Sequence, residues 1–178
     1  MSSTQEPTDR KALTYWALPL HSANWYEFFG WIQNNLYLVL DLHAAPGGQT
    51  GANIDDSYGY PFIYESAYYT DMTVQLWRAL AQRYKDETII LGYELLNEPI
   101  STDFNTNYFS PMLKPLYKKI TTAIREVDKN HMIILDGAVW ASQFHWFGTP
   151  FDSNLVYTFH KYWVDPTQNN IQEYIDLG

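Results

Sequence analysis

The chain of 178 residues is long enough for one domain with a sizeable core, and 46% of its residues are apolar. Its formal net charge of −9 argues against nucleic-acid and anionic-membrane partners, because neutralising phosphates requires a basic surface. The absence of cysteine excludes a disulfide framework and thiolate metal sites. Aromatic residues make up 17%, which suits either a tyrosine-rich core or a platform on which flat ligands such as sugar rings pack.

The N-terminal segment 1–11 is polar, and we expect it to be a disordered tail. It has no apolar h-region, so it does not predict a signal peptide. No stretch is long and apolar enough to span a bilayer. Because no linker interrupts the rest, residues 12–178 are expected to form one domain.

Short apolar runs then alternate with helical patterns. The runs that predict strands are 14–20, 36–42, 89–95, 132–136 and 155–159, and the helical patterns cover 25–34, 68–84, 111–128 and 167–177. Between the second strand and the second helix lies a loop, 44–65, that is long enough to suggest a function. Such alternation predicts an α/β fold of βαβ units, with about five parallel strands and flanking helices.

Polar and aromatic side chains follow four of these predicted strands at the same end. They are Asp41 and His43, Asn97 and Glu98, Asp136 and Trp140, and His160 and Tyr162. In α/β barrels and open parallel sheets, binding and catalytic sites form at the carboxyl ends of the strands. We therefore expect these side chains to contribute to one site, in which the residue type of Trp140 suits stacking on a ring.

Three segments resemble glycoside hydrolase family five, the retaining cellulases and related β-glycanases. Segment 92–99 (GYELLNEP) is similar to the family's strand-four signature, 40–49 (LDLHAAPGGQ) to its strand-three segment, and 160–162 (HKY) to its strand-six motif. The order and rough spacing agree, and the resemblance covers about residue 25 to the end. It implies a partial (β/α)8 barrel and hydrolysis of β-linked glucans, mannans or similar polymers with retention.

The resemblance also implies roles for individual residues. Glu98 corresponds to the general acid/base, which protonates the leaving oxygen and then takes a proton from water. Asn97 corresponds to the residue that hydrogen-bonds the sugar 2-hydroxyl, while His43, His160 and Tyr162 correspond to residues that order the carboxylates and the sugar. We expect neither a cofactor nor a metal ion.

The sequence also departs from the family pattern. A retaining mechanism needs a second carboxylate roughly 5–5.5 Å from the first, which the family places at the end of strand seven. No other glutamate of the chain lies in such a motif, and Ala17 aligns with the family's strand-two arginine. A complete barrel takes about 250 residues. We therefore expect a truncated barrel whose open edges a homo-oligomer covers.

Three functions remain open at this stage. The first is a small retaining β-glycosidase whose nucleophile comes from a second chain or from the long loop. The second is a carbohydrate-binding remnant without turnover. The third is a metal-assisted hydrolase built on Asp41, His43 and His160. Glu94 is interpreted as part of the strand's packing or a structural hydrogen bond. Cellulose, mixed-linkage glucan, mannan and short β-glucosides are all compatible substrates.

Overall fold

The computed structural model describes residues 37–162 and 165–176. The predicted tail at 1–11, the strand at 14–20 and the helix at 25–34 lie outside the described residues. Within them, one sheet has the order β1-β2-β3-β4, and all three strand pairs are parallel. The strands are β1 (Leu38–Asp41), β2 (Ile90–Glu94), β3 (Met132–Asp136) and β4 (Leu155–Thr158). Four of the five predicted strands are thus confirmed in position.

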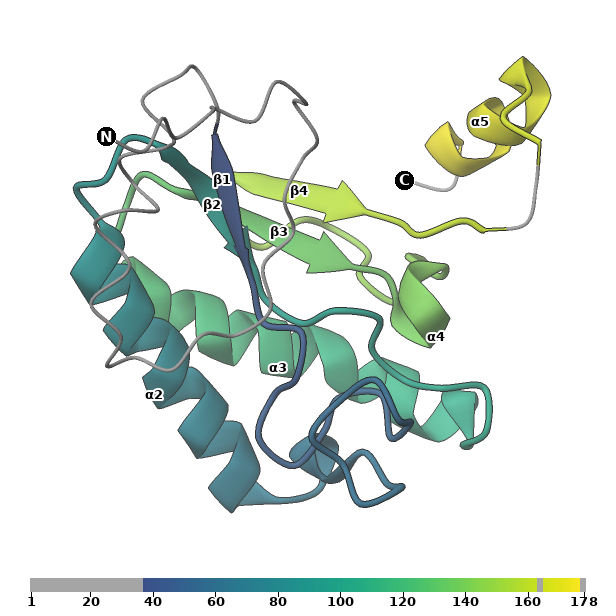
Figure 1. The fold of residues 1–178 in the computed structure, drawn as a ribbon, viewed down its shortest axis with the longest axis horizontal. Coiled ribbons are helices and arrows are strands. Elements are labelled where there is room, and N and C mark those ends of the chain that lie inside the picture. The colour runs from purple at the N-terminus through teal and green to yellow at the C-terminus, as the bar shows by residue number, and fades with distance from the viewer. Residues whose placement is uncertain (1–36, 163–164, 177–178) are drawn as a thin grey trace, which may run out of the picture.

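Helices connect and flank the strands. They are the short 3-10 helix η1 (Phe62–Tyr64) and the α-helices α2 (Ala67–Tyr84), α3 (Thr106–Arg125), α4 (Ala138–Ala141) and α5 (Gln168–Ile175). The long helices α2 and α3 lie on the same side of the sheet, whereas α5 stands beyond the end of β4 (Figure 1). In the described part of the chain, no helix has the length and apolar character that crossing a membrane requires.

The hydrophobic core fills the space between the sheet and its two long helices. Tyr93 and Leu135 of the sheet, Trp77 of α2 and Tyr117 of α3 are fully buried there. The indole Nε1–H of Trp77 donates a hydrogen bond of 3.0 Å to the backbone oxygen of Leu95, which anchors α2 to the end of β2. Large aromatic side chains with a satisfied polar atom therefore stabilise this layer.

The other face of the sheet has a different character. Val39 pairs with Gly92 and Asp41 pairs with Glu94, so these side chains share the face that points away from the helices. Val39 is 40% exposed, as an apolar side chain is when no second layer covers it. In a closed barrel this face lines the interior. Its carboxyl end carries Asp41, Glu94 and Asp136.

Helix α3 begins five residues before the start that the pattern at 111–128 predicts, and it ends at Arg125 rather than at 128. Asn105 caps it, because its side chain accepts a hydrogen bond of 3.3 Å from the backbone N–H of Tyr108. Pro111 and Pro115 both lie inside the helix. Proline is most frequent in the first turn of a helix. Pro111 therefore indicates, wrongly, that the helix begins there.

Candidate active site

Glu98 lies just beyond the carboxyl end of β2, with its backbone held on both sides. Its N–H donates to Asp136 Oδ2 at 2.8 Å, and its carbonyl oxygen accepts from Thr50 Oγ1 at 2.7 Å. Its φ of +43° is unusual for a residue with a side chain, and these two hydrogen bonds keep the backbone in that conformation. The Glu98 side chain is 16% exposed, so its carboxylate is sheltered but still reachable.

His160 follows β4 and faces Glu98. The two side chains meet at 2.9 Å between His160 Nδ1 and Glu98 Oε1. Because a carboxylate accepts hydrogen bonds, the proton belongs on Nδ1, which leaves the lone pair on Nε2. That Nε2 lies 3.9 Å from Asp136 Oδ2. The exposed ring of Tyr162 stands edge-on to the imidazole, with the ring centroids 6.4 Å apart.

A second chain of contacts joins β1 to the segment after β2. His43 Nδ1–H donates to Asp41 Oδ2 at 2.8 Å, and His43 Nε2 lies 3.4 Å from Asn97 Nδ2, in position to accept from the amide. Asn97 is only 4% exposed. Asn97 is thus buried, whereas the His43 side chain is 23% exposed, and the predicted roles of both residues toward a sugar remain predictions.

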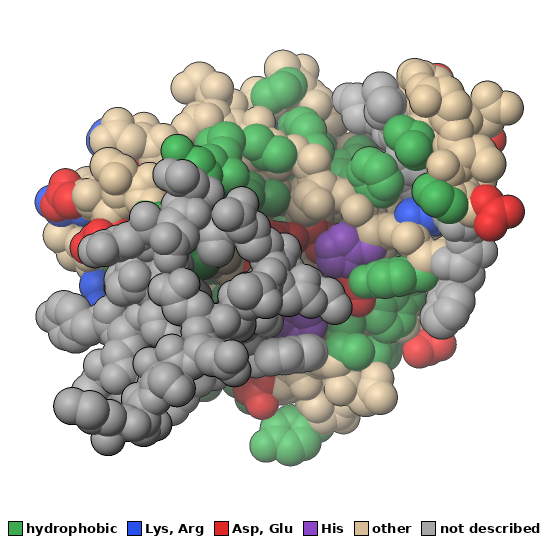
Figure 2. All heavy atoms as spheres, turned by 45° about the horizontal axis from the view of Figure 1, so that its top comes forward, with side chains coloured by type: hydrophobic (Ala, Val, Ile, Leu, Met, Phe, Trp, Pro, Cys, Tyr) green, Lys and Arg blue, Asp and Glu red, His purple; other side chains and the backbone are tan. Residues whose placement is uncertain are grey.

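An open hollow of about 470 Å³ adjoins Glu98. It is lined by Glu98, Thr102, Val139, Trp140, Ser142, His160, Lys161 and Tyr162. Four of the six predicted site residues thus meet here, and His43 and Asn97 are absent from the lining. In Figure 2, histidine side chains lie beside acidic and apolar ones on the viewed face.

The Trp140 side chain reaches the hollow from a left-handed turn. Val139, Trp140 and Ala141 all have φ of +57°, a conformation that residues with side chains rarely adopt. The Trp140 backbone N–H donates to the carbonyl oxygen of Pro99 at 3.3 Å, and its Nε1–H donates to Thr102 Oγ1 at 3.4 Å. Both contacts tie the segment after β3 to the segment after β2. Strained backbone that is held by its surroundings is common at functional sites.

Gln49 supports the site structurally, although the sequence predicted no role for this residue. It is fully buried, and its Nε2 donates to the carbonyl oxygens of His43 at 2.9 Å and Asn97 at 2.8 Å. Its Oε1 accepts the N–H of Ala45 at 3.0 Å. One side chain therefore holds together the segments that follow β1 and β2. Its place in the motif at 40–49 was the only signal available from the sequence.

Three carboxyl groups, those of Asp41, Glu94 and Asp136, lie on neighbouring strands beneath Glu98. Burial, reinforced by repulsion from Glu94, raises the pKa of Asp136 to about 9, so this carboxyl keeps its proton at neutral pH. Burial also raises the pKa of Glu94, with Asp41 adding to the effect. The pKa of Asp41 is raised by burial, although His43 opposes the shift. Glu94 is therefore a member of a polar cluster and does not serve the packing of the strand alone.

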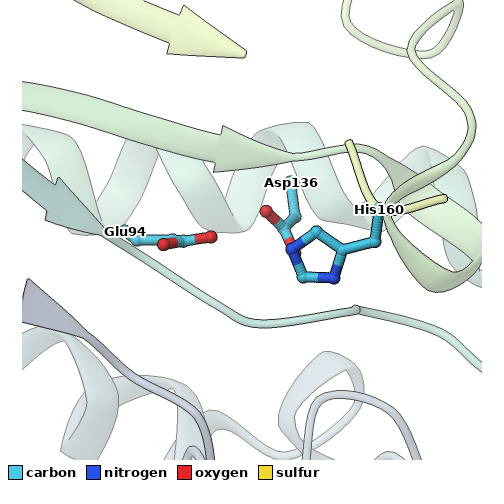
Figure 3. Close-up of side chains that lie close together, drawn as sticks. All are labelled: Glu94, Asp136 and His160. Atoms are coloured by element: carbon cyan, nitrogen blue, oxygen red, sulfur yellow. The ribbon is translucent and has the colours of Figure 1, made fainter. Parts of the chain in front are cut away.

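The described residues contain one group of this kind with the atoms to hold a metal ion. Glu94, Asp136 and His160 each offer one ligand atom, and these atoms lie within 4.8 Å of one another. Figure 3 shows the carboxyl group of Asp136 between the carboxyl group of Glu94 and the imidazole of His160. This set shares only His160 with the triad of Asp41, His43 and His160 considered from the sequence.

Comparison with known proteins shows the family of the chain. The sequence profile named Cellulase (glycosyl hydrolase family 5) matches residues 30–175. The chain belongs to this family. Over 135 residues it is 38% identical to a beta-xylosidase of Phanerodontia chrysosporium, covering 74% of the chain and 27% of that relative. Over 130 residues it is 32% identical to endoglucanase C of Acetivibrio thermocellus, covering 72% of the chain and 35% of the relative. The chain thus spans about a third or less of these relatives' length.

Solved structures agree on the fold. The endoglucanase Cel5A of Thermotoga maritima superposes with a TM-score of 0.55 at 22% identity. The superposition covers 82% of the present chain and 44% of the endoglucanase chain. An endogalactoceramidase gives a TM-score of 0.63 at 18% identity, covering 87% and 47%. The predicted partial α/β barrel is thereby confirmed.

Proposed function

We propose that this family 5 chain acts in the hydrolysis of β-linked glucans or β-glucosides, with Glu98 as the general acid/base. The observation that carries the proposal is the sheltered Glu98 carboxyl, held by His160 at 2.9 Å beside a hollow that Trp140 and Tyr162 flank. The names of its relatives, among them a beta-xylosidase, endoglucanases and a probable glucan 1,3-beta-glucosidase, support a β-linked substrate.

Each half of the acid/base role has a structural counterpart. A carboxylic acid beside the glycosidic oxygen protonates the leaving group, and the resulting carboxylate takes a proton from water in the second step. The Nδ1–H of His160 gives the ionised form a hydrogen-bond donor. The backbone contacts to Asp136 and Thr50 fix the direction of the side chain. Preorganisation of this kind supplies much of an enzyme's rate enhancement.

The surrounding residues take the substrate roles in this proposal. Trp140 and Tyr162 stack on sugar rings at the wall of the hollow. Asn97 meets the sugar 2-hydroxyl, and the contact of its amide with His43 orients it. Asp136 is not the nucleophile, because a fully buried carboxyl cannot reach an anomeric carbon. We infer that the nucleophile of a retaining reaction comes from outside the described residues or from a second copy of the chain.

The test compares wild type with Glu98→Gln on two aryl β-cellobiosides. With a 4-nitrophenyl leaving group, which benefits from protonation, the substitution should lower kcat/KM by about 10²-fold or more. With a 2,4-dinitrophenyl leaving group, which departs without a proton, the first step should be much less affected. The matched control is Glu87→Gln, an exposed glutamate before β2, which should leave both rates unchanged.

Equal rates for wild type and Glu98→Gln would refute the acid/base role. The aromatic hollow also supports a second candidate, saccharide binding without turnover. A wild type that does not hydrolyse either substrate, but whose tryptophan fluorescence responds to cellotriose, would replace the first function by the second. Neither turnover nor a response would refute both.

A further inference from the structure

The end of the long loop 44–65 and the first turn of α2 carry a row of aromatic rings. The ring centroids of Tyr68 and Tyr69 lie 5.3 Å apart. From Tyr69 the row continues to Phe62 at 6.3 Å, and from Phe62 to Tyr60 at 4.9 Å. These four rings are called the aromatic strip below. The described residues that line the hollow of the active site include none of the four.

The aromatic strip lies at the surface of the molecule. Tyr68 is 68% exposed and Phe62 is 37% exposed, while Tyr60 and Tyr69 are half-buried. In Figure 1 the start of α2 lies at the bottom of the view, well apart from α4, which carries Trp140 of the hollow. Large aromatic side chains that touch one another and remain in contact with water form a patch, and such patches mark binding surfaces.

Contacts with the backbone and the core hold the strip in place. The ring of Tyr69 lies directly against Gly47, whose φ is +77°, and a Cβ atom on Gly47 would come within 2.4 Å of that ring. The N–H of Phe62 donates to the carbonyl oxygen of Gly47 at 3.0 Å. Tyr60 stands edge-on to the buried ring of Phe109, with the centroids 5.9 Å apart. Rings that are fixed before binding lose little conformational entropy when a ligand arrives.

An exposed carboxylate adjoins the strip. Glu65 accepts the hydroxyl of Tyr60 at 2.7 Å through Oε2 and the hydroxyl of Tyr108 at 2.9 Å through Oε1. The hydrogen bond to Glu65 raises the pKa of both tyrosines, so both remain protonated donors. A carboxylate has about four acceptor positions. Glu65 therefore has the capacity to accept further donors from a ligand, and sugar hydroxyls are such donors.

Neighbouring rings of the strip are inclined to one another. The planes of Tyr68 and Tyr69 form an angle of 66°, those of Tyr69 and Phe62 an angle of 42°, and those of Phe62 and Tyr60 an angle of 54°. Rings inclined in this way cannot all lie flat on a planar face such as that of crystalline cellulose. A single flexible chain can turn from one ring to the next and pack the C–H faces of its sugars on each.

We propose that the aromatic strip, together with Glu65, is a second carbohydrate-binding surface that holds one chain of a soluble, neutral β-glucan. A neutral polymer fits because the Glu65 carboxylate repels anionic chains. The surface lies outside the hollow, so it holds a polysaccharide beside the active site rather than in it. The choice of a β-glucan rests on the proposed function, whereas binding to the strip requires no turnover.

The test is affinity electrophoresis in the cold through gels with and without soluble mixed-linkage β-glucan. Trp140→Ala serves as the background, because it removes the stacking ring of the hollow, and it should still be retarded by the glucan. Adding Tyr68→Ala should raise the apparent dissociation constant at least about fivefold, the loss expected from one stacking ring. Adding Tyr58→Ala instead, at a 92% exposed tyrosine outside the strip, should leave it unchanged.

Circular dichroism checks the fold of each variant, and Phe62→Ala replaces Tyr68→Ala if the latter does not fold. The proposal is overturned if Trp140→Ala is not retarded, or if Tyr68→Ala leaves its retardation unchanged. Retention on microcrystalline cellulose that Tyr68→Ala abolishes would refute the assignment to a single chain. A change in mass by light scattering without a change in retardation would make the strip a contact between protein copies instead.

The two proposals fail separately. A chain that hydrolyses the aryl β-cellobiosides but is not retarded by the glucan contradicts this inference alone. A chain that is retarded through the strip but hydrolyses neither cellobioside contradicts the proposed hydrolysis alone.

Discussion

At the scale of single residues, the site depends on side chains that bind backbone as much as on those that face the hollow. Thr50 and Asp136 hold the two peptide groups of Glu98, while Gln49 joins the segments after β1 and β2. These contacts use polar atoms that are completely or largely removed from water. Their loss therefore leaves buried donors and acceptors without partners, and this costs more than the hydrogen bond itself contributes.

Gln49→Ala should therefore lower the free energy of unfolding by about 2–3 kcal/mol, because three backbone groups lose their partner at once. Urea denaturation followed by tryptophan fluorescence measures the change. Gln75→Ala, the same substitution at an exposed position of α2, should be close to neutral. Similar losses in the two variants would show that Gln49 does not join the loops as described.

The positions of Glu98 and His160 after two predicted strands placed them at one end of the sheet, and in the structure their side chains are in contact at 2.9 Å. The same reasoning interpreted Glu94 as part of the strand's packing or of a structural hydrogen bond, and in the structure it has a side-chain hydrogen bond with Asp136. Alternation along a strand indicates which residues share a face, but the pKa of a carboxyl depends on what lies on the neighbouring strands. Asp41 precedes Glu94 by 53 residues and Asp136 follows it by 42. Only folding brings these carboxyl groups close enough to affect one another.

At the scale of elements, apolar runs located the four described strands to within two residues at either end. Parallel strands buried by helices leave such a run in the sequence. The start of α3 was harder to predict, because Pro111, a residue typical of the first helical turn, lies five residues after that start. The capping contact of Asn105 with the N–H of Tyr108 defines that start in the structure.

Asn105→Ala should lower the free energy of unfolding by about 1 kcal/mol, because the first turn of α3 loses its side-chain acceptor. Asn107→Ala, two residues further on and exposed, serves as the control and should be neutral or slightly stabilising, since alanine is the better helix former. Urea denaturation of both variants makes the comparison. A larger loss for the control would contradict the helix start at Thr106.

At the scale of the whole molecule, the sheet has one face covered by α2 and α3 and another that carries exposed apolar side chains. Val39 of β1 and Val156 of β4 are 40% and 38% exposed on this second face. Among the described residues, β1 and β4 are also the outer strands of the sheet. Exposed apolar surface and open strand edges both favour association.

We propose on this basis that the chain forms a homo-oligomer through the open face. Light scattering at several concentrations should give a mass above that of one chain. Val156→Lys, which places a charge on the open face, should shift the protein toward monomer. Tyr58→Lys, at a loop position that is 92% exposed, is the control and should not. A wild type that stays monomeric throughout the series would contradict the proposal.

The sequence by itself determined the alternation of strands and helices and the family, and it predicted that Glu98 and His160 lie at the same end of the sheet. These features depend on local periodicity and on short motifs, which can be recognised in the sequence without knowledge of the structure. Only the tertiary structure decided that Gln49 joins two loops and that Asp41, Glu94 and Asp136 form one buried cluster. The physical reason is that burial and electrostatic interaction depend on distance in space, and parallel strands bring together residues that are far apart in the chain.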